Sequence, residues 1–377
     1  MHFTFTPQQQ RLREELREFL STEAPRTPVK DGISREFSQK LAERGWIGIA
    51  WPTEYGGKDM TAMEQMIFTE EMIKHRAPRG YHFTAERQVG PSLIRHGTED
   101  QKREWIPRIL NAKVSFALGL SEPEAGSDLA AVTTTAIQDG DEYVVNGQKI
   151  WTSNAHRSDM IWLVTRTDPA APKHRGISCL MVDLDSPGIT IRPLYDMSGE
   201  HHFNEVFFDD VRVPVQRRVG EENRGWYILA EHLDFERSGI ERLIDLEDDY
   251  WKAVDHARAL AAKGWLPAQM RARIAELGVE LEVGRLLCYR VAWMQGEGIV
   301  PNAEASMAKV FGTEWSQRVT RIAQNLWGLA AAGYAEGSEG QRVARAYFTG
   351  VPRTIAGGTS EIQRNIIASR GLGLPRS

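Results

Sequence analysis

The chain has 377 residues, of which 41% are hydrophobic and 26% are charged, and this composition excludes a disordered or fibrous protein. At roughly 150 residues per domain, the length predicts two or three domains. Lysine and arginine number 46 against 51 aspartate and glutamate, and the resulting net charge of -5 argues against a nucleic-acid-binding surface.

Membrane, secretion and metal signals are absent from the sequence. No apolar run approaches the roughly 20 residues that a transmembrane helix needs, and the first residues lack the basic-then-apolar order of a secretory signal. The two cysteines, Cys179 and Cys288, are far apart and lack metal-ligand spacing. We therefore expect buried, reduced thiols in a cytoplasmic protein that binds neither a metal nor a membrane.

The first predicted region, residues 1–112, is helical. Leu12, Leu16 and Phe19 recur at helical spacing, and a second apolar stripe runs from Met63 to Met72. The glycines, prolines and tryptophans of residues 46–57 interrupt these helices as a loop. We expect an N-terminal helical domain that ends near residue 112.

The second predicted region, residues 113–224, is rich in β-type residues. Asn146-Gly147 divides EYVVNGQKIW into two β-rich runs and predicts a hairpin turn. Further short strands follow between turn residues, in DMIWLVTRT, GISCLMVDL, GITIRPL and NEVFFDDVRVP. Because parallel strands would need intervening helices, we expect an antiparallel sandwich or barrel. His201-His202 lies between two of these strands and is interpreted as a surface pair on a turn.

The third predicted region, residues 225–377, is helical again. Steps of three and four residues join one apolar seam that must be buried in a bundle, formed by Ile274, Leu277, Leu281, Gly284, Cys288 and Val291. Near the C-terminus, Gly357-Gly358 precede Ser360-x-x-Gln363, a pattern that predicts a capped helix start. The predicted order is therefore helical, then β, then helical.

Two segments rich in small residues remain as candidate binding sites. Leu118 to Asp128 and Ile355 to Ile367 both allow backbone N–H groups to approach a flat or anionic ligand. A polar connection and a plain capped helix are the alternatives. The motifs GxGxxG, GxxxxGK, HExxH, CxxC and GxSxG do not occur, which argues against a common nucleotide fold, a zincin or a nucleophile-elbow hydrolase. A Ser/His/Asp set assembled in space stays open.

Four ordered motifs resemble the acyl-CoA dehydrogenase family: LSEPEAGSD, NGQKIWTSN, NEVFFDDVRVP and GGTSEIQRN. WPTEYGG and HGTEDQKREWIPRI upstream are also similar, so the resemblance covers essentially the whole chain. It implies an α+β fold with an N-terminal helical domain (1–112), a central antiparallel β-domain (113–224) and a C-terminal four-helix bundle (225–377), with FAD between the last two. It also implies a tetramer whose neighbouring subunit completes the FAD site, and an electron-transferring flavoprotein as electron acceptor.

The resemblance assigns individual residues to the cofactor. The implied FAD contacts are Leu118, Leu120, Ser121, Gly126, Ser127, Trp151, Ser153, Asn325, Gly328, Thr359 and Glu361. Trp151 would stack on the flavin ring, whereas Asn325 and Gly328 would contact the FAD of a neighbouring subunit. NLWGLAAAG lacks the paired glycines usual near Gly328, and Arg258 and Arg271 are the candidates for the arginine that binds the FAD pyrophosphate. Both a homotetramer and a heterotetramer of two different chains therefore stay open.

The substrate would contact a second set of residues. Ser127 and Arg237 are the implied contacts of the acyl-CoA. Lys173 and Arg175 in PKHRGIS are further candidates for its phosphates, with a solvated basic turn as the alternative.

The reaction of the family needs a carboxylate that removes the proton α to the thioester carbonyl. In many members this base immediately precedes a Gly-Thr pair, and here that position is Gly357, which has no side chain. EHLDFERSGI places Glu236 before Arg237, as in the isovaleryl-CoA and long-chain dehydrogenases, whose base comes from this helix. Asp234 and Glu231 would point elsewhere, because two and five residues correspond to about 200° and 140° around a helix.

We therefore predict Glu236 as the base and the Gly357 backbone N–H as a donor to the thioester oxygen. The missing side chain also leaves space near the α-carbon, which suits a branched or ring-bearing acyl group. The predicted activity is FAD-dependent α,β-dehydrogenation of an acyl-CoA to the trans-2-enoyl-CoA, in fatty-acid or steroid side-chain β-oxidation.

Two other functions stay open on the same fold. One is a flavin-dependent monooxygenase or oxidase, against which the Glu236 carboxylate argues. The other is a partner subunit that completes the FAD site of a different chain. The retained SEPEAGSD and WTSN segments argue against this second role, and the missing glycines near Gly328 argue for it.

Overall fold

The computed structural model describes residues 4–27, 29, 32–230, 239–332 and 335–375. The chain forms two compact units that do not follow its order. The first consists of Met1–Thr22, Thr61–Arg76 and Arg237–Ser377, and the second of Glu23–Met60 and Ala77–Glu236.

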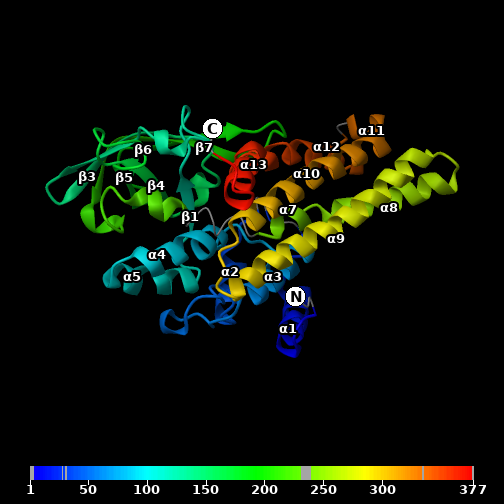
Figure 1. Ribbon diagram of the computed structural model, residues 1–377, viewed down its shortest axis with the longest axis horizontal. Coiled ribbons are helices and arrows are strands. Elements are labelled where there is room, and N and C mark those ends of the chain that lie inside the picture. The colour runs from blue at the N-terminus through cyan, green and yellow to red at the C-terminus, as the bar shows by residue number, and fades with distance from the viewer. Residues whose placement is uncertain (1–3, 28, 30–31, 231–238, 333–334, 376–377) are drawn as a thin grey trace. The chain divides into compact units, whose positions relative to one another are not determined.

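The first unit is helical (Figure 1). Its helices are α1 (Pro7–Glu23), α3 (Ala62–Lys74), α7 (Glu241–Ile244), α8 (Glu247–Ala262), α9 (Ala268–Gly296), α10 (Asn302–Trp327), α11 (Leu329–Ala332), α12 (Glu339–Gly350) and α13 (Ser360–Ile366). Helix α10 is central, because α8, α9, α12 and α13 all pack against it. The seam predicted between Ile274 and Val291 is buried on α9, so that prediction is confirmed.

Buried charges attach α3 to α1 and to the bundle. Glu70 on α3 is almost fully buried, and Arg13 of α1 contacts it with 2.7 Å between Nη2 and Oε2. Arg285 of α9 also contacts Glu70 and reaches Glu247 at the start of α8 at 2.9 Å. Removal of one partner from such a buried network would leave an uncompensated charge. The network therefore fixes α3 against helices that lie far from it in sequence.

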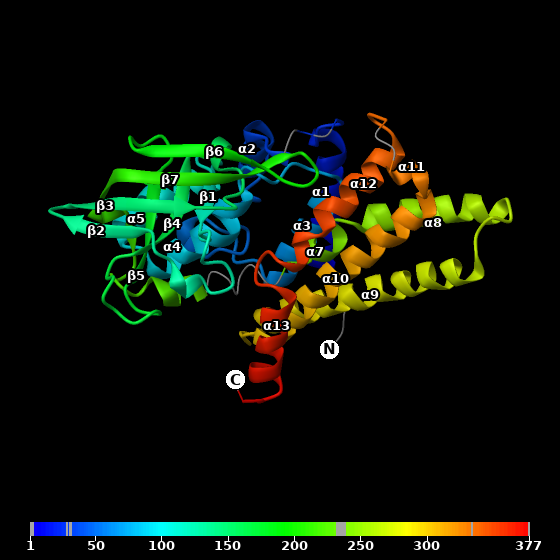
Figure 2. The same cartoon turned by 90° about the horizontal axis from the view of Figure 1, so that it is seen from above.

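The second unit combines one β-sheet with helices (Figure 2). The helices are α2 (Arg35–Glu43), α4 (Gly90–His96) and α5 (Glu99–Leu110). The strands are β1 (Phe116–Gly119), β2 (Thr135–Asp139), β3 (Glu142–Lys149), β4 (Met160–Arg166), β5 (Ile177–Asp183), β6 (Ile189–Tyr195), β7 (His201–Pro214) and β8 (Arg218–Val219). Their order in the sheet is β6-β7-β3-β2-β4-β5-β8, with β1 also paired to β4.

The sheet is mainly antiparallel, as predicted, but β4 accepts both β1 and β2 as parallel neighbours. The described strands form one hydrogen-bonded sheet, in which a single residue pair, Thr135 with Arg166, joins β2 to β4. Strand β4 is buried on both faces: Met160, Trp162 and Val164 pack with α4 and α5, whereas Ile161 and Leu163 pack with β3 and β7. This two-sided burial explains the nearly continuous apolar sequence of β4.

The predicted hairpin at Asn146-Gly147 is wrong. Strand β3 runs through both residues and pairs with β2 on one edge and β7 on the other. Gly147 lies where the β3–β7 register shifts, and a Cβ there would come within 2.6 Å of Thr134 Oγ1. The glycine therefore serves a close approach of strands. The turn between β2 and β3 is at Gly140-Asp141, where Gly140 has a φ of 65°.

The interpretation of His201-His202 as a surface turn is also wrong. Both residues begin strand β7 and are partly buried. The His201 ring stacks on His156 with 3.9 Å between ring centroids, and its Nε2 lies 2.8 Å from Asn204 Oδ1. The two cysteines are buried free thiols, as predicted, and burial raises the pKa of each to about 12.

Two further searches concern the described residues alone. None of their helices is both long and apolar enough to span a bilayer. No three or more of their His, Cys, Asp or Glu side chains are grouped so as to hold a metal ion.

Because His82 is buried in the second unit, we expect the stability of this unit to fall at acidic pH. Burial, and then the positive charge of Arg79, lowers the pKa of His82 to about 3. In the unfolded chain a histidine titrates near 6.5, so the unfolded state binds the proton more tightly between about pH 6.5 and 3. The free energy of unfolding must therefore fall as the pH is lowered through this window.

We expect His82→Gln to lose less stability than the parent between pH 8 and pH 5, by up to about 2 kcal/mol. Urea unfolding followed by tryptophan fluorescence at both pH values measures the difference. Equal losses in the two proteins would contradict the assignment.

Candidate active site

Two predicted FAD-binding segments of the second unit lie side by side. Leu118 is on β1, and Leu120 and Ser121 follow it, whereas Trp151 and Ser153 follow β3. The Ile150 N–H donates to the Ser121 carbonyl at 2.9 Å and joins the two segments. The structure thus brings these predicted contacts together at the ends of β1 and β3.

A buried ion pair holds this junction. The Lys149 side chain is 0% exposed, and its Nζ donates to the Leu120 carbonyl at 3.1 Å and to Glu122 Oε1 at 2.7 Å. Glu122 also accepts the Thr133 N–H and hydroxyl at 2.7 and 2.8 Å and the Thr134 N–H at 2.9 Å. All these bonds end on the segment that follows β1, so they fix its path.

The protonation states of the pair follow from these contacts. Burial opposes ionisation of Glu122, but the Lys149 charge and the donors on Thr133 and Thr134 outweigh it and lower the pKa of Glu122 to about 2. Burial also lowers the pKa of Lys149 to about 8, although the Glu122 carboxylate opposes this. The sequence search missed both residues, because neither belongs to the positions assigned to FAD.

Trp151 is presented as a rigid aromatic surface. It is 55% exposed and has a φ of 59°, a strained conformation for a bulky residue. Neighbouring contacts hold it there: the Thr152 N–H donates to the Asn204 carbonyl at 3.0 Å, and Asn204 Nδ2 donates to the Thr152 carbonyl at 2.9 Å. Phe203 packs edge-on against the indole with ring centroids 5.7 Å apart. A fixed, exposed indole is suited to stacking on a flat ring system.

The loop after Glu122 is open. A Cβ at Gly126 would meet no atom within 4 Å, and Ser127 beside it is exposed. Lys173 forms an ion pair with Asp128, which brings one of the predicted phosphate-binding residues next to Ser127. Arg175 lies on the same exposed turn, whose backbone is held by the Arg166 guanidinium.

The first unit contains the C-terminal candidates. Thr359 caps α13, because its hydroxyl accepts the Ile362 N–H at 3.2 Å. The predicted capping box of Ser360 and Gln363 is therefore wrong by one residue. Ser360 is the first helical residue, and its buried hydroxyl has no hydrogen-bond partner in the described part of the chain. Gln363 instead folds back and donates to the Gly357 carbonyl at 2.9 Å.

The remaining predicted residues are spread over the bundle. Gly357 and Gly358 have φ angles of 66° and 83°, a conformation that favours glycine. The Glu361 carboxylate accepts its own backbone N–H and the Thr359 hydroxyl, which lower its pKa. Asn325 is exposed in the last turn of α10, and Gly328 ends that helix. Glu236 and Arg237 lie outside the described residues.

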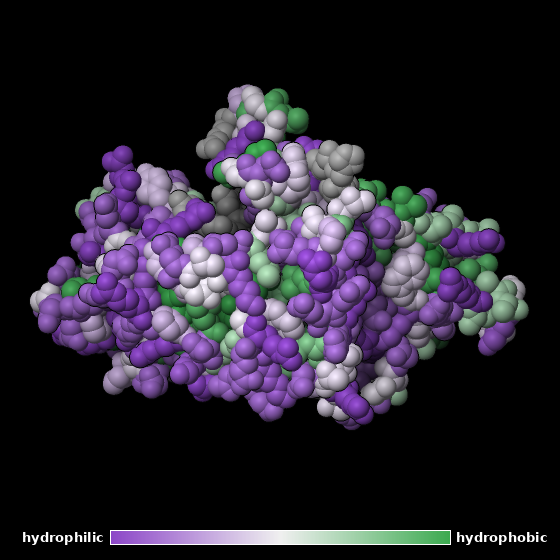
Figure 3. Space-filling view, turned by 90° about the horizontal axis from the view of Figure 1, so that it is seen from below, coloured by the Kyte–Doolittle hydropathy of each residue, from purple (hydrophilic) through white to green (hydrophobic). Residues whose placement is uncertain are grey.

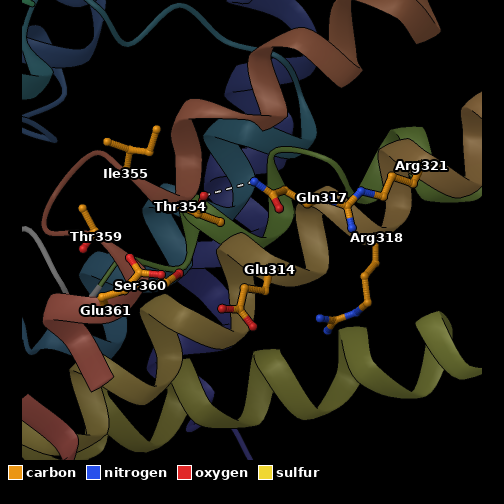
Figure 4. A pocket seen from close by; sticks show the side chains of 9 residues that line it. All are labelled: Glu314, Gln317, Arg318, Arg321, Thr354, Ile355, Thr359, Ser360 and Glu361. Carbon is orange, nitrogen blue, oxygen red and sulfur yellow. Dashed lines mark hydrogen bonds between the residues drawn. The ribbon is translucent and has the colours of Figure 1, made fainter. Parts of the chain in front are cut away.

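A pocket of about 510 Å³ lies between α10 and the segment that leads into α13 (Figure 4). Its lining residues are Glu314, Gln317, Arg318, Arg321, Thr354, Ile355, Thr359, Ser360 and Glu361. Arg258 and Arg271, the sequence-based candidates for the pyrophosphate, do not line it: Arg258 pairs with Asp255 at 3.0 Å and Arg271 is exposed on α9.

Arg318 and Arg321 are the cations at this pocket, and the sequence search missed them. Arg318 pairs with Glu280 at 3.0 Å, whereas the Arg321 side chain extends toward Gln317 in Figure 4. Arg318, Arg321 and Asn325 follow one another on α10 at steps of three and four residues, so they share one face of the helix. This spacing is the sequence signal that links the two arginines to the predicted contact Asn325.

The Lys149–Glu122 pair allows a direct test of what holds the segment that follows β1. Lys149→Met leaves a buried carboxylate without its cation, and we expect a loss of about 3–5 kcal/mol in the free energy of unfolding. The double variant Lys149→Met/Glu122→Gln should recover part of this loss, because neither charge then remains unpaired. Urea titrations of the three proteins measure it. A single variant as stable as the parent would show that the pair does not hold the loop.

Comparisons with known proteins agree with the motifs. Three family models match in chain order: the acyl-CoA dehydrogenase N-terminal domain at residues 6–113, the middle domain at 117–211 and the C-terminal domain at 223–372.

The similarity to individual relatives extends over the whole chain. The acyl-CoA dehydrogenase FadE26 of Mycobacterium tuberculosis is 36% identical, covering 100% of both chains. The structure of the Tcur3481-Tcur3483 steroid ACAD superposes with a TM-score of 0.89 at 34% identity, again over 100% of both chains. The ChsE4-ChsE5 complex from Mycobacterium tuberculosis gives a TM-score of 0.87 at 37% identity and the same coverage. The chain belongs to the acyl-CoA dehydrogenase family of oxidoreductases.

Proposed function

We propose that this acyl-CoA dehydrogenase carries out the FAD-dependent α,β-dehydrogenation of an acyl-CoA thioester to the trans-2-enoyl-CoA. The observation that carries the proposal is Trp151, a strained and exposed indole fixed beside the Ser121 segment. This surface and the open loop at Gly126 fit a flavin ring. FAD, when bound, supplies the hydride acceptor. We propose that the residues assigned to FAD from the motifs bind this cofactor. We also propose domain boundaries at residues 1–112, 113–224 and 225–377.

The protein supplies the base and the polarising donors. Glu236 takes the α-proton, an assignment that rests on the sequence because the residue lies outside the described part of the chain. The Gly357 N–H donates to the thioester oxygen as negative charge develops on it. Exclusion of water by the acyl chain raises the basicity of the carboxylate. Ser127 and Arg237 orient the CoA ester.

A bulky acyl group, steroid-derived or branched, is the proposed substrate. Gly357 supports it, because no side chain occupies the position that carries the base in many relatives. The similarity to the Tcur3481-Tcur3483 steroid ACAD supports the steroid alternative.

Anaerobic mixing with straight, branched and steroid-acid CoA thioesters, without NADPH or reduced flavin, tests the proposal. Bleaching of the flavin supports a dehydrogenase, whereas absence of bleaching with every thioester would favour a monooxygenase or a partner subunit.

We further propose assembly into a tetramer, homomeric or heteromeric, that passes electrons to an electron-transferring flavoprotein. An exposed apolar stripe on α9 supports assembly, formed by Val279, Val283, Leu286 and Trp293. Separately from this stripe, Figure 3 shows apolar surface at its right-hand end, where the turn between α8 and α9 carries the exposed Trp265. The similarity to the ChsE4-ChsE5 complex supports the heteromeric form.

Cofactor retention tests the assigned flavin contacts. We expect Trp151→Ala to remove a stacking face and Thr359→Ala to remove a helix cap beside the predicted site. Loss of stacking costs roughly 0.5–1.5 kcal/mol beyond burial, which corresponds to about a two- to twelvefold weaker affinity for FAD. Flavin fluorescence on serial dilution measures retention. If both variants keep FAD as the parent does, the assignment of these residues is wrong.

The assigned base is tested by a change that keeps its shape. Glu236→Gln should still bind FAD and substrate but slow flavin reduction by about 10²–10⁴-fold, since it removes only the general base. Asp234→Asn is the matched control, because the family resemblance predicts a helix for this segment and two residues along a helix turn the side chain by about 200°. Anaerobic stopped-flow absorbance measures the rate. Reduction of Glu236→Gln at the parent rate would mean that the base lies elsewhere.

A further inference from the structure

The turn at Gly357-Gly358 has high conformational freedom but must place a hydrogen-bond donor accurately. Two consecutive glycines lose more conformational entropy than any other pair when they are ordered. A donor to a developing oxyanion must nevertheless be held in place before the reaction begins. Neither glycine has a side chain to hold the turn, so its order must come from other residues.

Side chains from three helices bind the three successive carbonyls of this turn. Arg242 Nη1 of α7 donates to the Ala356 carbonyl at 3.4 Å, Gln363 Nε2 of α13 to that of Gly357 at 2.9 Å, and Lys309 Nζ of α10 to that of Gly358 at 2.6 Å. On the N-terminal side, the Ala356 N–H donates to the Pro352 carbonyl at 2.9 Å. The turn is therefore held through its backbone on both sides of Gly357.

The N–H groups of the two glycines point away from these side chains. Within the described part of the chain, the N–H groups of Gly357 and Gly358 have no hydrogen-bond partner. In a trans peptide the C=O and N–H point in opposite directions, and the described chain contains no cis peptide bond. Side chains that bind the carbonyls of Ala356 and Gly357 therefore aim the N–H groups of Gly357 and Gly358 away from themselves.

Two of the side chains that bind the turn, Lys309 and Gln363, are buried, which indicates that their geometry is fixed. Lys309 is 1% exposed and Gln363 is 0% exposed, although both side chains are polar. Burial of a cation is costly unless it is fully partnered, so Lys309 must keep its contacts with the turn. A Cβ at Gly358 would lie 2.5 Å from Gln363 Nε2, which shows how closely the amide packs on the turn.

We propose that Lys309 and Gln363 are positioning residues for the thioester oxygen. Gln363 binds the Gly357 carbonyl and so aims the Gly358 N–H of the same peptide unit, whereas Lys309 binds the next carbonyl, that of Gly358, and so fixes the end of the turn. Together with Arg242 on the Ala356 carbonyl, they hold the N–H groups of Gly357 and Gly358 as donors that polarise the substrate carbonyl, and we call these side chains the clamp. Arg242 supports the same turn from its other side. The inference rests on the proposed function, because it assumes that an acyl-CoA oxygen lies at this turn.

The variants Lys309→Met and Gln363→Met test the clamp, with Gln101→Met as the control. Gln101 is a buried glutamine of the second unit that donates to the carbonyls of Gln216 and Arg218 at 2.7 and 2.8 Å. FAD content and circular dichroism establish that each variant is folded. The two replacements address the same turn by different chemistry, so either folded variant is sufficient for the test.

The readouts are the rate of anaerobic flavin reduction and the infrared carbonyl stretch of a bound probe. The probe is 3,3-dimethylbutanoyl-CoA labelled with ¹³C at the carbonyl, which has no β-hydrogen and so cannot be oxidised. In the parent, hydrogen bonds should lower the stretching frequency relative to the free thioester. In Lys309→Met and Gln363→Met it should return toward the free value, and reduction by a substrate should slow by about 10- to 100-fold. Affinity for the probe should stay within about threefold.

The two readouts separate the inference from the proposed function. If the parent is bleached by acyl-CoA and both folded variants keep its rate and carbonyl frequency, the clamp is wrong and the function stands. If the parent polarises the carbonyl and the variants do not, but no thioester bleaches the flavin, the clamp stands and the function is wrong. A parent that shows neither effect overturns both. The double variant should lose little more than the worse single variant, because both side chains act through one turn.

Discussion

In each of the two units, a buried lysine bound to a backbone carbonyl holds a loop that contains predicted site residues. Lys149 binds the Leu120 carbonyl in the second unit, and Lys309 binds the Gly358 carbonyl in the first. Both side chains are almost completely removed from water. A buried ammonium group is stable only when its partners stay in place. Each lysine therefore restricts its loop more tightly than an exposed hydrogen bond would.

Small side chains make such external support necessary. The Ser121–Ser127 segment and the Gly357-Gly358 turn offer backbone groups and space to a ligand, but they have few side chains to pack. Order comes instead from Lys149 with Glu122 in one unit and from Lys309 with Gln363 in the other. Trp151 follows the same principle, because its strained backbone is kept by Asn204 and Phe203 on strand β7.

Local pattern was enough to predict the elements but not the contacts between them. The seam of α9 and the apolar strands β4 and β5 were found because periodicity reports burial directly. The hairpin prediction at Gly147 failed because a glycine is needed there for the close approach of Thr134, which is 13 residues away in the sequence. A local sequence pattern does not show such a contact. The cap was misplaced by one residue because Thr359 and Ser360 are both good capping residues. Lys149 and Lys309 were missed, and Gln363 was assigned only to a helix cap, because lysine and glutamine are usually exposed and only tertiary packing buries them.

The clamp and the proposed base have a common origin in the absence of a side chain at Gly357. The motif resemblance implies that in many relatives one residue at this position supplies both a carboxylate and a backbone N–H. With glycine at this position, proton abstraction passes to Glu236 in our proposal, and the N–H alone remains at the turn. The turn then needs side chains from other helices to aim it, which is what Lys309, Gln363 and Arg242 provide. Separation of the two roles frees the volume beside the α-carbon without loss of the polarising donor, and this is the physical condition for accepting a bulky acyl group.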